Sequence, residues 1–235
     1  MEGERRRLIH ERLTRRLREI AGTSRAQAAL SSELPDGFSR EALVAELAVV
    51  AGLFPPSPLR ERIFGEPTFL KKGASPMRMR EWEISRAAIL ETFRALRAGG
   101  IDLEREKKSL RMSFAHSGGV AIAIAVSAGE KAEFGVDLEK EGRAVSDAAF
   151  ARFFRPEEGA FLKARLDHWV LKEACYKAHP RAGTTVVADY VLTGGDPEKL
   201  DFKVLCTKGA PEKFRGIVDS VDGYRYALAT RVSIA

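Results

Sequence analysis

The segment that most constrains the fold is Val120 to Val126, where β-branched residues alternate with alanine in the longest purely apolar run of the chain. This run is far too short to cross a bilayer, so we expect a buried strand rather than a membrane helix. Leu110 to Ala115 and Phe134 to Leu138 are also short, β-branched or alternating, and glycine turns separate the three segments. The sequence therefore predicts three strands in the middle of the chain and no transmembrane segment.

Helical patterns dominate the first hundred residues. The chain begins with an arginine-rich amphipathic segment whose apolar residues form one stripe: Leu8, Ile9, Leu13, Leu17 and Ile20. We interpret it as a solvated helix packed on the core, in preference to a nucleic-acid contact. A turn-rich connector from Pro55 to Pro76 follows, and then a second helix from Arg80 to Leu96, which Gly99 and Gly100 end.

The carboxyl half returns to helices and then to strands. Ser146 and Asp147 can cap one helix, Pro156 can occupy the first turn of a second, and Asp167 can cap a third that runs to His179. Four strands of an antiparallel sheet are then expected, at Thr184 to Leu192, Phe202 to Cys206, Phe214 to Val218 and Tyr224 to Val232. The predicted fold class is α+β.

Charge and cysteine content narrow the class of protein only in part. The net charge of +6 and the isoelectric point near 9.4 favour anionic partners, which include nucleic acid, phosphorylated cofactors and acidic proteins. The amino terminus lacks the apolar stretch of a secretory signal, so we expect a cytoplasmic protein with no membrane partner. Cys175 and Cys206 lack the spacing of a zinc or redox pair and are interpreted as two buried thiols.

Two acids of the segment Phe134 to Glu139 share one face of their strand. Side chains alternate along a strand, so Asp137 and Glu139 point to the same side. Neighbouring carboxylates in a partly dehydrated place repel one another, and such a pair protonates, spreads into water or binds a cation. Taken alone, this pattern is more typical of solvated acids than of a metal site.

A predicted helix from His168 to Ala178 carries an unusual face. Helical spacing places two aromatic and three charged residues on it: Trp169, Lys172, Glu173, Tyr176 and Lys177. The plainer interpretation is a surface pair of Glu173 with Lys177, with the aromatic rings in contact with the core.

A third pattern lies where the strand from Leu110 runs into a glycine turn. The segment Ser113 to Gly119 contains His116 and Ser117 directly before two glycines. Backbone amides at such a turn, with a hydroxyl and an imidazole, suit a phosphate or pyrophosphate, although a histidine beside glycines is more often a turn residue. The order of all three patterns in one chain favours a joint function.

Together these patterns resemble the 4′-phosphopantetheinyl transferase superfamily, in particular its larger, two-halved type. Gly135 to Glu139 match the family's Gly-(Val/Ile)-Asp-x-Glu motif, and Trp169 to Lys177 match its (Trp/Phe)-x-x-Lys-Glu-(Ala/Ser)-x-x-Lys motif. His116 to Gly118 match its Ser-His-Ser-Gly segment, Phe154 to Glu158 its aromatic-Pro-Glu-Glu helix start, and Arg80 to Ala88 its arginine-containing helix. The resemblance covers roughly residues 78 to 235.

Two positions depart from the family pattern. Ala115 replaces the usual serine before the histidine, which removes one hydroxyl contact to the cofactor. Val170 stands where serine is common, at a position that we expect to point away from the carboxylates. The resemblance implies two similar α/β halves in a pseudo-two-fold arrangement. We expect a helical segment at 1–75, the rest of the first half at 76–130, and the second half, with the metal and catalytic motifs, at 131–235.

The resemblance also implies a chemistry. Asp137, Glu139 and Glu173 would bind Mg²⁺, or Mn²⁺ in its place, together with the pyrophosphate of coenzyme A as co-substrate. Glu173 would take the proton from the serine of an acidic apo acyl or peptidyl carrier protein, and 3′,5′-ADP would leave.

The remaining charged residues of the motifs take supporting roles. Lys177 would contact the transferred phosphate, Lys172 would contact phosphate or orient Glu173, and Arg86, His116 and Ser117 would lie on the coenzyme A side. We expect a monomer that does not bind nucleic acid.

Three alternatives stay open at this point. A basic nucleic-acid-binding module would explain the charge and the arginine-rich start, but it leaves the three acids without a role. A metal-dependent phosphohydrolase could use the same carboxylates. A relative that has lost activity would be consistent with the alanine at position 115.

Overall fold

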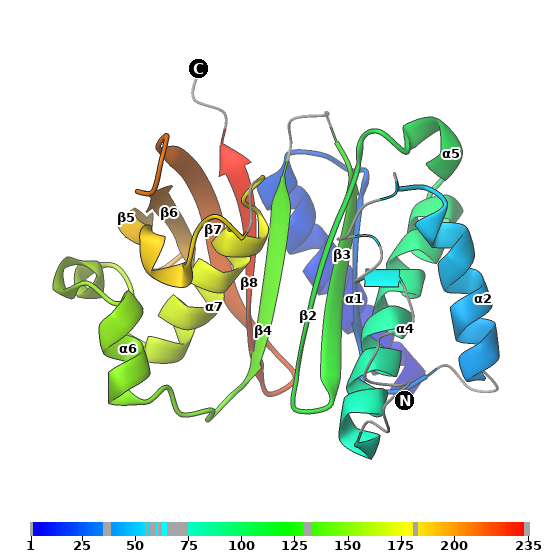
Figure 1. Ribbon diagram of the computed structural model, residues 1–235, viewed down its shortest axis with the longest axis horizontal. Helices are drawn as coiled ribbons and strands as arrows, with labels where there is room; N and C mark the ends of the chain where they lie inside the picture. The colour runs from blue at the N-terminus through cyan, green and yellow to red at the C-terminus, as the bar shows by residue number, and fades with distance from the viewer. Residues whose placement is uncertain are drawn as a thin grey trace.

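Two antiparallel sheets form the centre of the fold (Figure 1). The structure is a computed structural model that describes residues 2–34, 39–54, 56, 60, 63–64, 75–128, 133–180 and 183–232. The three-stranded sheet has the order β1 (Ala26–Ser31), β3 (Val120–Ser127), β2 (Leu110–Ser117). The five-stranded sheet has the order β4 (Phe134–Lys140), β8 (Tyr224–Val232), β7 (Glu212–Val221), β6 (Asp201–Cys206), β5 (Tyr190–Asp196). Mixed helix and antiparallel sheet confirm the α+β class.

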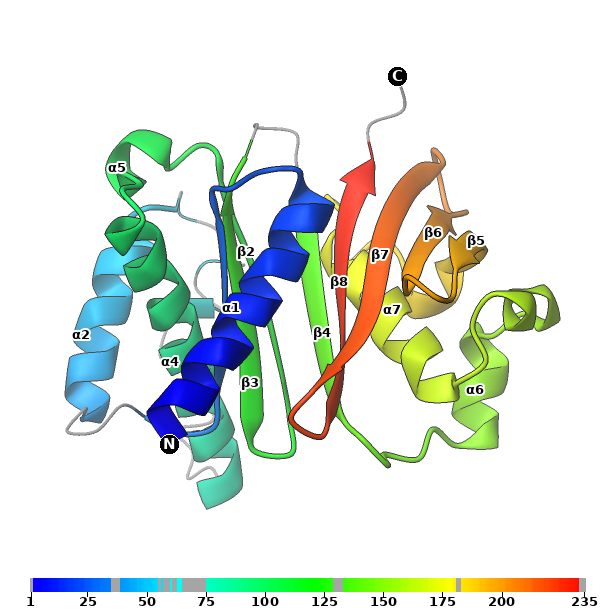
Figure 2. The ribbon, with the colours of Figure 1, turned by 180° about the vertical axis from the view of Figure 1, so that it is seen from behind.

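Each sheet carries its own helix on the side that Figure 1 faces. Helix α4 (Pro76–Ala98) covers the three-stranded sheet and α2 (Arg40–Ala51) packs against α4, while α7 (Arg165–Lys177) covers the five-stranded sheet. Helix α1 (Glu2–Ala21) crosses the back of both sheets (Figure 2). The shorter elements are α5 (Leu103–Glu106), α6 (Asp147–Phe153), η2 (Pro156–Ala160) and η3 (Val187–Asp189).

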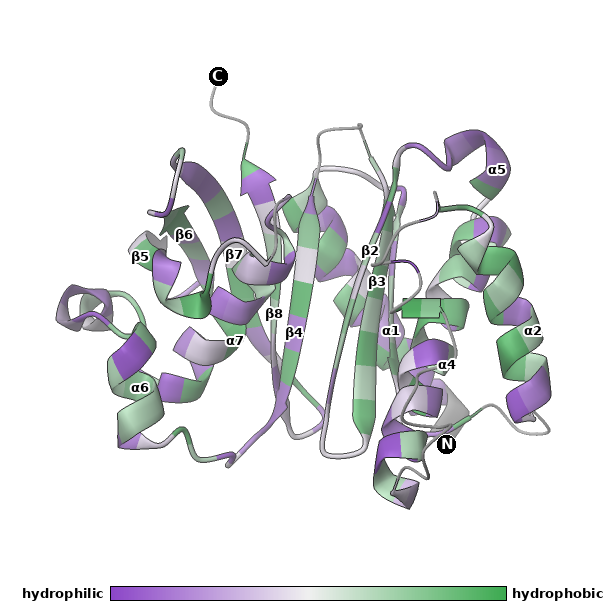
Figure 3. Ribbon diagram, viewed as in Figure 1, coloured by the Kyte–Doolittle hydropathy of each residue, from purple (hydrophilic) through white to green (hydrophobic). Residues whose placement is uncertain are grey.

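The apolar residues divide among three clusters that match these layers. One lies between α1 and the backs of the two sheets, one between α4, α2 and the three-stranded sheet, and one between α7 and the five-stranded sheet. Figure 3 shows β3 largely in the hydrophobic colour. Burial of these apolar side chains supplies the main driving force for the fold. No helix in the described part of the chain is both long and apolar enough to cross a membrane.

The two sheets meet along β2 and β4, where serine hydroxyls of β2 accept hydrogen bonds from backbone amides of β4. The Val136 amide donates to Ser113 Oγ at 3.1 Å, and the Lys140 amide donates to Ser117 Oγ at 3.3 Å. A strand edge needs such partners because unpaired backbone groups are costly when buried. The junction brings the Ser-Gly turn of β2 beside the end of β4.

Most predicted elements are confirmed. The three central strands are present, Ser146 caps α6, Pro156 begins η2, and Gly99 follows the last residue of α4. Leu13, Leu17 and Ile20 of α1 are buried, and Cys175 and Cys206 are buried thiols. The connector predicted from Pro55 to Pro76 lies mostly outside the described residues.

Four predictions are wrong. The segment 1–75 is not wholly helical, because β1 pairs with β3 within the first sheet. Asp167 does not cap α7, which begins at Arg165; its carboxylate instead accepts hydrogen bonds from Arg225 on β8, at 2.7 and 2.8 Å. The strand expected from Thr184 begins only at Tyr190, after the turn η3. Leu8 is 54% exposed, so it lies outside the buried stripe of α1.

Candidate functional site

Strand β4 and helix α7 touch backbone to backbone, and this contact positions the site. Phe134, Val136 and Leu138 point into the core on the α1 side, which leaves the alternate residues facing α7. A Cβ atom built on Gly135 would lie 2.0 Å from the Ala174 carbonyl oxygen and 2.7 Å from the Ala178 amide. Only glycine permits this approach, and the acids that follow it on β4 therefore lie close to the last turns of α7.

Asp137 is the buried centre of the site. Lys177 Nζ donates to Asp137 Oδ1 at 2.7 Å, whereas Oδ2 is buried and has no hydrogen-bond partner among the described residues. Burial raises the pKa of Asp137, and the neighbouring Lys177 opposes that shift. Burial also raises the pKa of Glu173, and the negative charge of Asp137 raises it further. The carboxyls of Asp137 and Glu173 are thus close enough to repel one another.

Glu139 is held from two sides. Ser117 Oγ donates to Glu139 Oε2 at 2.6 Å, and the Arg143 guanidinium pairs with Oε1. The turn that carries the serine is fixed in its own right, because Tyr224 donates its hydroxyl to the Gly118 carbonyl at 3.0 Å. Ser117 was predicted to lie on the coenzyme A side; in the structure its hydroxyl fixes the rotamer of a strand carboxylate.

His116 joins the same group from the neighbouring strand. Its Nδ1 lies 4.0 Å from Glu81 Oε1 on α4. Burial lowers the pKa of His116 and Glu81 opposes the shift, with smaller contributions from Lys177, Arg86 and Asp137. The imidazole therefore lies within electrostatic range of charged groups from α4, β4 and α7.

Arg86, which we predicted to contact the nucleotide, is buried within the first half. Its Nε donates to the Ile63 carbonyl at 3.0 Å, and its guanidinium lies 5.2 Å from the ring centroids of both Trp82 and Phe114. Burial lowers the pKa of Arg86 to about 10. The guanidinium is positioned by a carbonyl and two aromatic faces, a desolvated setting in which cation–π attraction is strong.

Lys172 does not lie with the site residues, so the predicted shared face is wrong at this position. Its ammonium is buried and pairs with Glu158 Oε1 at 2.7 Å, and it also donates to the Phe153 carbonyl. Glu158 accepts two further hydrogen bonds, from the amides of Arg155 at 2.8 Å and Leu192 at 2.7 Å. Successive helical residues point about 100° apart, so Lys172 faces α6 and η2 while Glu173 faces β4.

The three predicted metal ligands are not assembled as a metal site. Among the residues that the structure describes, no group of three or more histidine, cysteine, aspartate or glutamate side chains is arranged to hold a metal ion. Lys177 neutralises Asp137 and Arg143 neutralises Glu139, which is the expected response of repelling carboxylates to the nearest cations. The set that lies together is therefore mixed: acids from β4 and α7, a lysine from α7 and a histidine from β2.

A scan against models of known protein families matches no family, and a search of curated proteins matches none of them. The site must therefore be interpreted from its own chemistry. Its carboxylate oxygens are the hard donors that Mg²⁺ prefers, and the orphaned Oδ2 of Asp137 lacks a donor or a cation. Lys177 and His116 offer the positive charge and donors that a phosphate group needs.

Sequence reasoning missed several contacts of the site. Glu81, Arg143 and Tyr224 were not singled out, although Arg143 follows Glu139 by four residues. The fully buried Glu158 belongs to the aromatic-Pro-Glu-Glu segment, which the sequence did mark. The Arg155 amide is a local donor at the start of η2, but Lys172 and the Leu192 amide come from α7 and β5, and no local pattern reveals their convergence.

Proposed function

We propose that this chain transfers the 4′-phosphopantetheine group of coenzyme A to the serine of an apo carrier protein in a Mg²⁺-dependent reaction. One observation carries the proposal: Asp137 is buried with one oxygen unpaired, and Lys177 and Glu173 from α7 and Glu139 from the same strand surround it. These are the residues that the two strongest motifs of the resemblance assign to metal and phosphate. An ordinary solvated acid would be exposed and would not need them.

The architecture is consistent with the proposed two-halved fold. In each half one long helix, α4 or α7, covers one face of an antiparallel sheet, and the halves adjoin along β2 and β4 (Figure 1). The site residues come from both halves and lie on the α4 and α7 side. We propose that this is the pseudo-two-fold arrangement of the phosphopantetheinyl transferases.

The chemistry of these donors suits a divalent metal, and the described carboxylates would have to rearrange to form its site. Asp137 and Glu139 from β4 and Glu173 from α7 would hold Mg²⁺, which supplies charge neutralisation to a pyrophosphate when it is bound. The unpaired Oδ2 of Asp137 is the observation that favours such a ligand over a purely internal ion pair. Arg143 is 53% exposed but Glu139 is only 8% exposed, so Arg143 can leave only if the bound metal takes over the neutralisation of this carboxylate.

The chain's own residues would divide the remaining work. Lys177, which now contacts Asp137, would also contact an oxygen of the transferred phosphate through its flexible side chain and three N–H donors. Glu173 would accept the proton of the carrier serine as its oxygen attacks the β-phosphorus, and 3′,5′-ADP would leave with the electrons of the broken P–O bond. Ser117 would keep Glu139 in position through its 2.6 Å hydrogen bond. The net charge of +6 would speed encounter with an acidic carrier.

The test is a transfer assay with three kinds of carrier. The chain is incubated with coenzyme A, Mg²⁺ and apo-carriers of fatty-acid, polyketide and peptide-synthetase origin, and the carriers are weighed by mass spectrometry. We expect at least one carrier to gain the phosphopantetheine mass. Asp137→Asn and Glu173→Gln should each lower the rate by at least about a hundredfold, which corresponds to about 2.7 kcal/mol of barrier. Glu104→Gln, an exposed acid of α5, is the matched control and should keep the wild-type rate.

Three outcomes would contradict the proposal. Wild-type transfer by the Asp137→Asn or Glu173→Gln variant would refute the assigned site. Turnover of coenzyme A with no carrier present would favour a phosphohydrolase. Salt-sensitive binding to nucleic acid, with no binding of coenzyme A, would favour a nucleic-acid module.

A further inference from the structure

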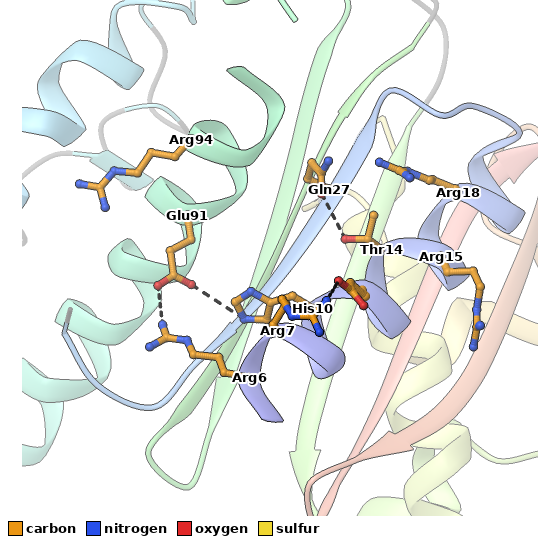
Figure 4. A pocket seen from close by; sticks show the side chains of 10 residues that line it. Arg6, Arg7, His10, Thr14, Arg15, Arg18, Gln27, Glu91 and Arg94 are labelled. Atoms are coloured by element: carbon orange, nitrogen blue, oxygen red, sulfur yellow. Dashed lines mark hydrogen bonds and ion pairs between the residues drawn. The ribbon is translucent and has the colours of Figure 1, made fainter. Parts of the chain in front are cut away.

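A cavity of about 690 Å³ lies between α1, β1 and α4, apart from the residues of the candidate site (Figure 4). Gln27 of β1 and Glu91 of α4 contribute to its wall, and the largest group of lining side chains is basic: Arg6, Arg7, Arg15, Arg18 and Arg94. Its volume lies within the roughly 300–1,000 Å³ range of small-molecule sites. A cavity lined by five guanidiniums calls for an explanation beyond solubility.

The cavity does not offer a free strand edge. The outer edge of β1 is already hydrogen-bonded by α1 side chains that follow one another at intervals of four residues. His10 Nε2 lies 3.1 Å from the Leu30 amide and 2.9 Å from its carbonyl and bonds one of the two, according to its tautomer. Thr14 Oγ1 accepts from the Ala28 amide at 3.0 Å, and Arg18 Nε donates to the Ala26 carbonyl at 3.2 Å. A peptide therefore cannot extend the sheet here without displacing α1, which excludes β-augmentation as the use of this cavity.

Some of the positive charge is neutralised within the cavity wall. Arg6 pairs with Glu91, and Arg7 pairs with Glu11 at 2.6 Å. Figure 4 shows Glu91 between Arg6 and His10, on the side of the cavity that α4 forms. Glu91 and Glu11 are therefore neutralised by Arg6 and Arg7 and do not cancel the charge of the other arginines that line the cavity.

Arg15 and Arg18 supply the charge that is left. Among the described residues, no acid forms an ion pair with either guanidinium. They stand three residues apart on α1, so they share a face of the helix, with the side chain of Gln27 also lining the cavity. Figure 4 shows the Arg18 guanidinium directed toward Gln27 and the Arg15 guanidinium directed away from it. When the exposed Arg15 side chain turns toward Arg18, the two forked donors match an anion with more than one charged group.

We propose that this cavity binds a small molecule with two or more adjoining phosphate groups, held by Arg15 and Arg18. The arginines gather at one place on the chain, which favours a compact anion over a nucleic-acid backbone with its extended row of phosphates. The cavity lies at the β1 edge of the three-stranded sheet and the candidate site lies at its β2 edge. Helix α4 reaches both, because it carries Glu81 beside His116 and Glu91 beside the cavity.

The experiment is calorimetric titration of the full chain with inorganic tripolyphosphate, at low ionic strength and without divalent metal. We expect one saturable site, and binding of orthophosphate at least about tenfold weaker because it can engage only one guanidinium. The double variant Arg15→Gln/Arg18→Gln should weaken tripolyphosphate binding at least about tenfold. Arg105→Gln/Arg152→Gln removes the same charge from exposed positions of α5 and α6 and should bind as the wild type does.

Two further variants separate this proposal from folding defects and from the proposed function. Arg15→Gln alone keeps the Arg18 contact to β1, so a loss of binding in that variant cannot come from release of the strand edge. Lys177→Gln should leave tripolyphosphate binding unchanged even if it abolishes transfer. Three results would each overturn the proposal. The first is equal weakening of binding in both double variants, and the second is loss of binding in Lys177→Gln. The third is complete displacement of tripolyphosphate by duplex DNA at equal phosphate concentration.

Discussion

Replacement of Lys172 by methionine tests whether this lysine is structural or catalytic. The family resemblance places it beside phosphate or Glu173, whereas the structure buries its ammonium against Glu158. Lys172 is 1% exposed and Glu158 is fully buried. Methionine keeps most of the volume and removes the charge, so the substitution leaves a buried carboxylate with only its two backbone donors.

The magnitude follows from what the carboxylate loses. Removal of one partner from a buried ion pair costs about 3–5 kcal/mol, because the other charge stays buried without compensation. For a chain of this size about 1 kcal/mol shifts the melting temperature by roughly 2–4 °C, so we expect a fall of roughly 6–20 °C. Lys172→Met combined with Glu158→Gln should recover part of the loss, since glutamine carries no charge. It keeps one acceptor oxygen, for only one of the two backbone amides that Glu158 binds through separate oxygens.

Thermal unfolding and transfer rate, measured on the same variants, separate the two interpretations. The structure predicts a large fall in melting temperature with transfer per folded molecule retained well below that temperature. Lys172→Met with an unchanged melting temperature and abolished transfer would refute the structural role and restore the catalytic one. Arg152→Gln, which removes an exposed charge from α6, provides the control for a general effect of charge.

Two further predictions concern packing and pH. Gly135→Ala should destabilise the fold by about 1–3 kcal/mol or more and abolish transfer, because the added Cβ would overlap the Ala174 carbonyl. Urea unfolding measures the loss of stability. The control is Gly159→Ala, whose Cβ would contact only Phe154, at 3.6 Å. Burial lowers the pKa of His168 below 6.5, with Leu162, Glu158 and Asp167 opposing and Lys172 adding to the shift. As the pH falls, the unfolded chain takes up the proton before the folded protein does, so stability should fall as the pH drops below about 6.5. His168→Gln should make the urea midpoint depend less on pH between about pH 5.5 and 7.5. The same dependence on pH in the variant as in the wild type would contradict this.

Local patterns predicted the parts of the site that local geometry determines. Strand alternation placed Asp137 and Glu139 on one face, and helical spacing placed Glu173 and Lys177 one turn apart on α7. Both predictions depend only on the period of a single element. The same reasoning failed for Lys172, because its direction was judged without knowledge of the buried acid on η2.

Tertiary context explains the elements that sequence reasoning missed. The segment Ala26–Ser31 contains no β-branched residue, so its composition gives no strand signal. It becomes a strand because β3 pairs with one edge and α1 side chains satisfy the other. Asp167 resembles a helix cap in sequence, but Arg225, distant along the chain, takes its carboxylate. Such partners are set by the fold and not by neighbouring residues.

The cations that meet the strand acids show how a site of this kind can be stable before it binds anything. The carboxylates of Asp137 and Glu173 repel one another, and Asp137 in particular is too buried to rely on water. Lys177 and Arg143 supply the missing charge, the first from α7 and the second from just beyond β4. A phosphate that shares the Lys177 ammonium weakens its neutralisation of Asp137, and one that draws it away leaves the buried carboxylate in need of another cation. Under the proposed function, phosphate and metal would therefore favour each other's binding, and the shared residue is Lys177.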